Sequence, residues 1–427
     1  MRSNCMDLRI QELIDFTKTK LGLNNYYLQE HRFYRSVNSC NETVYTLSME
    51  WFPNHAVQED DGSNPDGTAS VEIDLKSRKF KSVIFVMGKS YAENGITFSN
   101  LNKEDIIKWI EAETELTYGE QFRLNREEGG ELYFKSCIDG VAVSPPGYID
   151  IKFDREGMLT LFSIYGQFPS KELIKEEKYD LSLDRLEQLG KEQLKLIEYP
   201  SYEQKKLYPI YALEEIFATN NGTKTIPFGV FANESNFLKM DQTIFWDEPM
   251  KKPFERKKID WIEDLTADQA FSCEPSPDAF SITKVEQKKC MVAVKNLLCQ
   301  EYPGESGNWA LKELYRDKGS IHATLKAVHQ DYRVFQRKIK VWIDSKSFQA
   351  VNYMDSKLML KTFDDFQSPG QVTITKEDAY EKLKSMFELK PYYVFDFKQK
   401  QYVLCGKLDC HYGVNASNGE VIALDDL

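Results

Sequence analysis

The residues whose types best suit metal binding lie near the end of the chain. Cys405, Cys410 and His411 offer two thiolates and one imidazole, a soft ligand set that suits zinc. Their spacing is not that of a Cys-x-x-Cys knuckle, and no second ligand pair stands nearby. An offset of five also puts Cys405 and Cys410 on opposite faces of a strand, unless Gly406-Lys407 forms a tight turn. We therefore expect strand cysteines here and no bound metal.

Histidines give no further sign of a metal or catalytic centre. On one regular strand His322 and His329, seven residues apart, would face opposite sides. The chain has no HExxH, no P-loop and no GxGxxG after a strand. None of the five histidines forms a pair with metal-binding spacing: His31, His55, His322, His329 and His411.

The loop Asp60–Gly67 carries enough oxygens to wrap calcium. It lacks the D-x-D-x-D-G frame and the closing glutamate at the twelfth position, so we expect a solvated loop. Three pairs of adjacent glutamates could suggest acid–base chemistry, but their charged surroundings favour solvated surfaces. These pairs are Glu127-Glu128, Glu176-Glu177 and Glu214-Glu215.

Three cysteines are possible nucleophiles, but no histidine has an identifiable pairing with any of them. They are Cys137, Cys290 and Cys299. The sequence therefore predicts no catalytic residue, no metal-binding residue and no cofactor, and it leaves the binding residues unknown.

The elements that position these residues are amphipathic helices followed by strand-like runs. The first helix is expected from Leu8 to Leu21, ended by Gly22, and the segment Thr283–Glu286 reads as a capping box. The third helix carries apolar residues from Leu183 to Leu194. The five helices start near short polar residues: Asp7, Asn102, Ser182, Thr283 and Thr375.

Hairpins recur after the helices. Leu132–Gly166 shows the pattern best, because the turns Asp139-Gly140 and Asp154–Gly157 separate three alternating strand runs. Four stretches end alike: VEIDLKSRKFKSV, IDIKFDREGMLTL, IKVWIDSKSFQAV and YGVNASNGEVIAL. We expect an α+β fold of tandem modules, each with one amphipathic helix packed on a small antiparallel sheet.

The predicted modules fall into two halves, about 1–250 and 280–427. The middle module lacks the shared ending, and the stretch between the halves is rich in charge and proline, which is typical of a linker. The predicted boundaries are 1–90, 91–172, 173–246 for the divergent module, 247–280 for the linker, 281–366 and 367–427.

Composition excludes several classes of protein. The 427 residues are 41% apolar, which indicates a folded protein, and 55 basic against 67 acidic residues give a net charge of −12. That charge disfavours nucleic acid and anionic membranes. Eight cysteines in so long a chain do not make a disulfide framework. With no signal-peptide pattern and no transmembrane run, we expect a cytoplasmic protein.

The repeated stretches resemble a known family. TKEDAYEKLKSMFELKPYYVF with YGVNASNGEVIALDD, and SCIDGVAVSPPGYIDIKFDREGMLTLFSIYG, are similar to PepSY modules. The double arrangement, with LYPIYALEEIF in the middle unit, resembles the bacterial YcdB/YcdC repeat proteins. Two departures stand out: Val328–Asp331 replaces the usual turn in the fourth module, and the first hairpin has no glycine. The resemblance implies a binding or regulatory role, with a peptidase as partner, and brings no catalytic residues.

Aromatic side chains are the last candidates for a binding surface. Alternate members on the strands should pack against a helix, and the others either form an exposed strip or cover sheet surface between modules. One module holds Tyr133, Phe134, Tyr148, Phe153, Phe162 and Tyr165. We expect a non-enzymatic protein that binds a protein or peptide strand at a sheet edge. The alternatives are a hydrolase with a site between the halves, lined by His329 or Cys410 and carboxylates, and a structural assembly protein.

Overall fold

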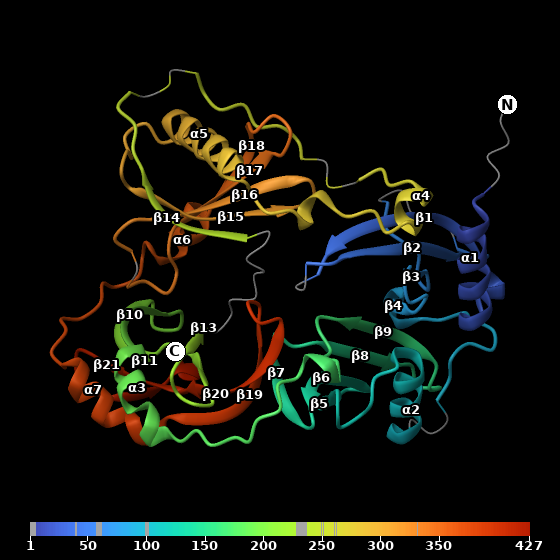
Figure 1. The fold of residues 1–427 in the computed structure, drawn as a ribbon, viewed down its shortest axis with the longest axis horizontal. Coiled ribbons are helices and arrows are strands. Elements are labelled where there is room, and N and C mark those ends of the chain that lie inside the picture. Colours follow the sequence, from blue (N-terminus) through green and yellow to red (C-terminus); the bar gives the residue numbers. More distant parts are fainter. Residues whose placement is uncertain are drawn as a thin grey trace. The chain divides into compact units, whose positions relative to one another are not determined.

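The computed structural model describes the whole chain except residues 1–5, 39–40, 57–61, 99–101, 228–236, 249, 251, 260, 262 and 331. The protein is α+β, with short helices and several antiparallel sheets (Figure 1). It divides into two compact units, each assembled from stretches far apart in the sequence. The first comprises Met1–Lys175, Ile262–Ser276 and Tyr393–Tyr402, and the second comprises Glu176–Trp261, Pro277–Tyr392 and Val403–Leu427.

The first unit contains one extended antiparallel sheet. Its strand order is β1-β2-β3-β4-β9-β8-β6, with β5 on the far side of β6 and β7 paired to the end of β6. Alternate residues of these strands are buried, as expected for a sheet with one packed face and one open face. The strands are β1 (Tyr26–Val37), β2 (Thr43–Pro53), β3 (Ala69–Asp74), β4 (Phe80–Phe85), β5 (Phe122–Glu128), β6 (Glu131–Ile138), β7 (Val141–Ser144), β8 (Tyr148–Phe153) and β9 (Leu159–Tyr165).

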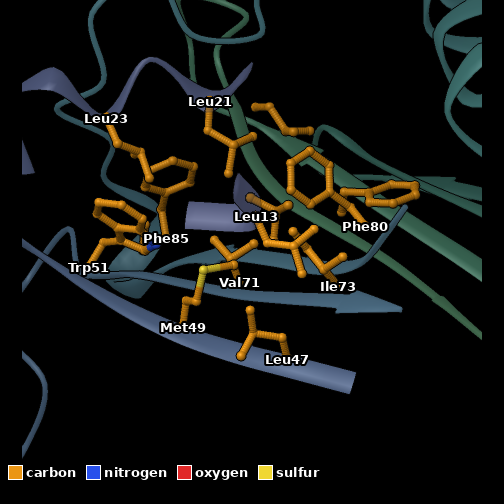
Figure 2. Close-up of a cluster of buried hydrophobic side chains, with 14 of the residues drawn as sticks. Leu13, Leu21, Leu23, Leu47, Met49, Trp51, Val71, Ile73, Phe80 and Phe85 are labelled. Carbon is orange, nitrogen blue, oxygen red and sulfur yellow. The ribbon is translucent and has the colours of Figure 1, made fainter. Parts of the chain in front are cut away.

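Two helices cover the packed face of this sheet. They are α1 (Leu8–Leu21) and α2 (Lys103–Thr114), and both contribute to one continuous apolar core. Figure 2 shows side chains of α1, such as Leu13, lying against Val71 and Ile73 of the sheet. Each fully buried aliphatic side chain of this kind stabilises the fold by about 1.5–3 kcal/mol.

A third, short helix extends this core beside β1. It is α4 (Ala267–Phe271), whose capping box is formed by Thr266 and Gln269. Its Ala270 is buried in the core, and the Phe271 ring lies 5.9 Å from the ring of Phe33. Residues 262–276, which the sequence predicts to be linker, therefore pack as part of the first unit.

One core of the second unit lies between a five-stranded sheet and a long helix. The helix α5 (Lys284–Glu301) covers one face of the sheet (Figure 1), and its capping box is formed by Thr283 and Glu286. The strand order follows the sequence: β14 (Phe237–Ile244), β15 (Trp309–Asp317), β16 (Ser320–Ala327), β17 (Lys338–Asp344) and β18 (Ala350–Asp355).

A second group of strands in this unit packs against α3 (Glu187–Gln193) and α7 (Lys376–Leu383). One sheet has the order β10-β11-β21-β22, and β20 pairs with β12, which pairs with β13. The short helix α6 (Lys357–Leu360) follows β18. The strands are β10 (Leu194–Ser201), β11 (Lys206–Leu213), β12 (Ile216–Thr219), β13 (Thr225–Pro227), β19 (Glu388–Asp396), β20 (Gln401–Asp409), β21 (Tyr412–Asn415) and β22 (Val421–Ala423). Residues 393–402, at the end of β19 and the start of β20, belong to the first unit.

Most of the local predictions are confirmed. The predicted caps at Asp7, Asn102, Thr283 and Thr375 each accept a backbone N–H. All four hairpin endings are paired strands. The predicted helix from Ser182 to Leu194 differs, because a 3₁₀ turn occupies Leu183–Leu186 and strand β10 already begins at Leu194. In the described part of the chain no helix combines the length and the apolar character that crossing a membrane requires.

Candidate functional site

The longest described strand, β1, forms one margin of the first unit's sheet. All of its twelve residues except Gln29 pair with β2 on one side, and no other described segment pairs with its second side. Tyrosine, phenylalanine and valine favour the extended conformation and make a strand of this stretch. A long strand edge with unpaired backbone groups is a template to which another strand can be added.

A β-bulge decides which side chains this edge shows to solvent. Gln29 has no partner, because the register steps directly from Leu28 to Glu30. One extra residue moves everything after it to the opposite face. As a result Tyr27 and Tyr34, seven apart, lie on the same open face, where their side chains are 44% and 46% exposed. Without the bulge the two rings would lie on opposite faces.

Backbone hydrogen bonds at the two ends of the β1–β2 hairpin fix which residues face outward. The N–H of Asn54 donates to the carbonyl of Asn25 at 2.8 Å, and the N–H of Asn38 donates to Glu42 at 2.9 Å. In an antiparallel pair, alternate residues point their N–H and C=O groups to the same side. Within the described residues, no backbone partner exists for the outward-facing groups of His31, Phe33, Arg35 and Val37.

The edge of β1 is also the most continuous open edge among those we compared. Glu30 to Val37 pair with β2 over eight residues without a register shift. The strands β5 and β14 also have one side without a described neighbour, but shifts after Leu124 and after Lys239 break each into short runs. Typical strands have about five to six residues, so only the β1 edge offers a full strand length in one register.

Carboxylates give this edge an acidic character on its open face. Glu30 lies directly opposite Glu50 in the register, and Glu72 lies on the next strand. Burial raises the pKa of Glu50, and the charges of Glu30 and Glu72 raise it further, against hydrogen bonds from Ser70 and Asn64. A basic side chain placed beside Glu30 would relieve this repulsion.

The other face of β1 is already occupied by α4 and its flanking residues. The Phe33 side chain is 7% exposed and meets Phe271 edge to face. The Arg35 Nε donates to Glu263 Oε2 at 3.2 Å, which holds the flanking segment to the strand. An added strand would therefore meet solvent-exposed tyrosines on one face and the α4 segment on the other.

The predicted division of the aromatic residues on β6, β8 and β9 is confirmed. Phe134, Phe153 and Phe162 pack in the core. The tyrosines of the open face are partnered with one another and with cations. Tyr148 stacks on Tyr165 with ring centroids 5.2 Å apart, Lys135 Nζ lies 5.7 Å from the Tyr148 ring, and Arg126 lies 4.3 Å from the Tyr133 ring. Because of these cross-strand contacts, the three tyrosine rings are less available than the Tyr34 ring for contact with a partner.

The structure does not bring together the three potential zinc ligands of the C-terminal region, which are Cys405, Cys410 and His411. Cys410 packs in the core against α3 and α7, and Leu408 lies in the same core. Cys405, an odd number of residues from Leu408, is buried on the other side of β20. His411 is exposed, with Nε2 3.9 Å from Glu388 Oε2. The described residues contain no group of three side chains that could hold a metal ion.

The three candidate nucleophiles are buried thiols. Burial raises the pKa of Cys137, of Cys299 and of Cys290, the last to about 11. A raised thiol pKa keeps the sulfur protonated near neutral pH and makes it a poor nucleophile. The two histidines compared in the sequence analysis lie in different environments. His329 is exposed just beyond β16, while His322 is buried within that strand.

One glutamate pair departs from the expectation of solvated surfaces. Glu215 is half-buried, and its Oε1 lies 3.2 Å from Lys407 Nζ, which also contacts Asp409 at 2.6 Å. Burial raises the pKa of Glu215, and the charge of Asp409 raises it further. The other pairs lie at the surface: Glu127 and Glu128 pair with Lys103 and Arg126.

The predicted calcium loop falls partly outside the described residues, which resume at Gly62. Two of its remaining oxygen-bearing side chains already have protein partners. Asn64 donates to Glu50 at 3.0 Å, and Asp66 pairs with Lys89 at 2.5 Å.

Sequence reasoning did not identify the edge of β1 as the site. The stretch belongs to the strand-like runs expected after the first helix, but its position in the sheet depends on pairing that no local pattern reveals. The one available signal was the composition of the stretch, which mixes tyrosines at 27 and 34 with the charged residues Glu30, Arg32 and Arg35. The contribution of Phe271, more than two hundred residues away, carries no signal of this kind.

Comparisons with known proteins add little to this geometry. No family model matches the chain, and no curated protein matches it. A search of solved structures returns the Bacillus megaterium YpeB C-terminal domain, at 9% sequence identity over 81% of this chain and 96% of that chain, with a TM-score of 0.21. So low a score carries no argument about fold or function, and the resemblance to PepSY modules stays a prediction.

Proposed function

We propose that this chain is a non-enzymatic protein that binds an extended segment of a partner protein at the edge of β1. The observation that carries the proposal is the run Glu30–Val37, whose outward N–H and C=O groups have no partner within the described chain. In strand addition, main-chain hydrogen bonds supply affinity and alternate side chains supply selection.

The side chains of β1 define the chemistry of the bound segment. A lysine or arginine fits beside Glu30, where three carboxylates share the open face. An acidic residue fits beside Arg32, and an apolar or aromatic residue fits beside Tyr34. Cross-strand pairs of these kinds each contribute about 0.2–1 kcal/mol, so selection comes from several of them together.

We also propose that the chain is built of tandem PepSY-like modules. The element order supports this: a helix precedes antiparallel strands at α1, α2, α3, α5 and α7. The resemblance to PepSY modules suggests a peptidase as the partner, and the bound segment would then be an exposed strand or tail of that enzyme.

The test uses a proline on the outward side of the edge. The variant His31→Pro removes one outward N–H and places a ring where a partner strand would lie, while the bonds to β2 remain. A partner captured from the native cell's lysate by the wild-type chain would be purified, and its affinity measured for wild type, His31→Pro and His31→Ala. We expect a loss of about tenfold or more for the proline variant.

The alanine variant is the matched control, because it removes the same side chain and keeps the N–H. It should bind as the wild type does, and the circular dichroism of both variants should match the wild type. Equal affinity of His31→Pro and wild type for the partner would remove the edge from the mechanism.

A further inference from the structure

The first unit has a hollow of about 540 Å³ at one end of its sheet, and His31 is not among its lining residues. Its walls come from the end of the β1–β2 hairpin, the β3–β4 turn, the last residues of α2 and the segment Tyr165–Phe168. Pockets for small molecules commonly measure about 300–1,000 Å³. The hollow is therefore large enough for a small ligand.

Two of the carboxylates that line the hollow already have cationic partners. Glu113 is paired with Lys20 at 2.5 Å and accepts the backbone N–H of Phe80 at 3.4 Å. Glu115 is paired with Lys79 at 2.9 Å. These two ion pairs leave no net charge for a ligand to match.

Two further charges line the hollow without an ionic partner among the described residues. Asp74 accepts the N–H and hydroxyl of Ser77 at 2.8 Å through Oδ1 alone, so its Oδ2 is available. Lys81 Nζ donates a hydrogen bond to the Thr46 hydroxyl at 3.4 Å. Thr46 lies directly opposite Asp74 in the register, so both charged residues adjoin the same threonine.

A β-bulge places the lysine at this position. The pairing of β3 with β4 steps from Ser82 to Phe80, and Lys81 is the extra residue. Bulges turn a side chain away from the regular alternation and often lie beside binding sites. Phe80, Ile164 and Phe168 add apolar surface to the same walls.

We propose that this hollow binds a free α-amino acid with an apolar side chain. Its carboxylate would pair with Lys81 and its ammonium with Asp74, while the side chain contacts the half-buried Ile164 and Phe168. The two charged groups of an α-amino acid share one carbon, so they match two opposite charges that adjoin the same threonine. A simple anion or a simple cation would leave one of the two protein charges unmatched.

The experiment is a calorimetric titration of the full chain with L-phenylalanine. Three related probes each lack one feature: N-acetyl-L-phenylalanine lacks the ammonium, L-phenylalanine amide lacks the carboxylate, and glycine lacks the apolar side chain. We expect saturable binding of L-phenylalanine and at least tenfold weaker binding of each other probe.

Two variants test the two charges separately. Lys81→Met keeps the length of the side chain, and Asp74→Asn keeps the oxygen that accepts from Ser77; each should weaken L-phenylalanine at least tenfold. Lys76→Met is the matched control, since Lys76 is exposed in the same turn and does not line the hollow. It should leave the affinity unchanged.

Several outcomes would overturn the proposal. Equal binding of N-acetyl-L-phenylalanine would indicate a simple anion site, and equal binding of the amide would indicate a simple cation site. Absence of saturable binding up to about 10 mM would remove the site altogether. Because His31→Pro leaves the hollow unchanged, a failure at the β1 edge and a failure here are distinguishable.

Discussion

Two sheets of this protein carry a helix on one face, yet they are covered differently elsewhere. In the second unit, part of the face of the sheet β14–β18 opposite α5 is covered, because His322 is 1% exposed there and its ring lies near those of Tyr315 and Trp342. Its edge strand β18 is also covered, because the N–H of Lys257 donates to the carbonyl of Val351 at 2.8 Å. In the first unit, the face beyond α1 and α2 is open and the edge of β1 has no neighbour among the described residues.

This difference shows that the chain uses more than one way to protect an edge. Three strands of the second unit, β18, β10 and β11, receive backbone hydrogen bonds from other segments, whereas β14 keeps one side without a described neighbour: Glu198 of β10 exchanges hydrogen bonds with residues 332 and 334, and the N–H of Leu207 of β11 donates to Gln367. The β1 edge has charged side chains and a bulge, which discourage random pairing without blocking the backbone. The backbone N–H and C=O groups of such an edge can still pair with a partner strand whose side chains are complementary.

The largest expected effect concerns the covered face of the second sheet. Burial is the main cause that lowers the pKa of His322 to about 4; the charges of Lys340 and Lys318 act in the same direction, and a backbone hydrogen bond of Asp317 opposes them. In the unfolded chain the imidazole titrates near 6.5. Between pH 6.5 and 4 the unfolded state therefore binds a proton that the native state does not, and stability falls as the pH falls. We expect a loss of about 3 kcal/mol across this window, measured by urea unfolding.

The variant His322→Leu supplies the control for this pH dependence. It should lose less stability between pH 6.5 and 4 than the wild type, because it has no imidazole to protonate. If the two proteins lost stability in parallel, the burial of His322 would not be the cause of the acid sensitivity.

The next effect concerns the covered edge. The Phe254 ring lies 5.7 Å from the ring of Tyr353 on β18, and the Phe254 N–H donates to Glu301 at 3.1 Å. Phe254→Ala keeps that N–H and removes the half-buried ring, so the free energy of unfolding should fall by about 2 kcal/mol. Met354→Ala on the same strand removes a side chain that is 59% exposed and should change it by less than about 0.5 kcal/mol. Equal effects of the two substitutions would mean that this segment does not hold the edge.

The smallest effect on stability is expected at the open edge. Tyr34→Thr keeps a strand-forming residue and removes a ring that is 46% exposed, so unfolding should change by less than about 0.5 kcal/mol. Binding of the captured partner should weaken about fivefold, because the exposed part of the ring would pack on the added strand. Affinity would be measured by the same titration as for His31→Pro.

Tyr148→Thr is the matched comparison on the same open face. It breaks the stack with Tyr165 and the contact with Lys135, so it should destabilise the chain by about 1 kcal/mol and leave partner binding unchanged. A result in which Tyr148 affects binding and Tyr34 does not would move the site from the edge to the centre of the sheet.

Local signals in the sequence predicted much of the fold. The caps at Asp7 and Thr283, the hairpin turns and the alternation on β6 and β8 depend on neighbouring residues, and all are confirmed. The site was not predictable in this way. The bulge at Gln29 exists only in relation to β2, and the cover of Phe33 comes from residue 271. The hollow likewise depends on Lys81 and Thr46, which are 35 residues apart.

The assembly of the first unit from separate stretches has a consequence for its synthesis on the ribosome. The N–H of Ser276 donates to the hydroxyl of Thr43, a residue made 233 positions earlier. At about 5–20 residues per second, roughly ten to fifty seconds pass before this segment emerges. Throughout that interval the nascent chain exposes Phe33 and the growing edge of β1 together. The nascent chain therefore exposes, beside an open strand edge, an apolar side chain that the α4 segment later packs against. The rate of translation sets how long this exposure lasts.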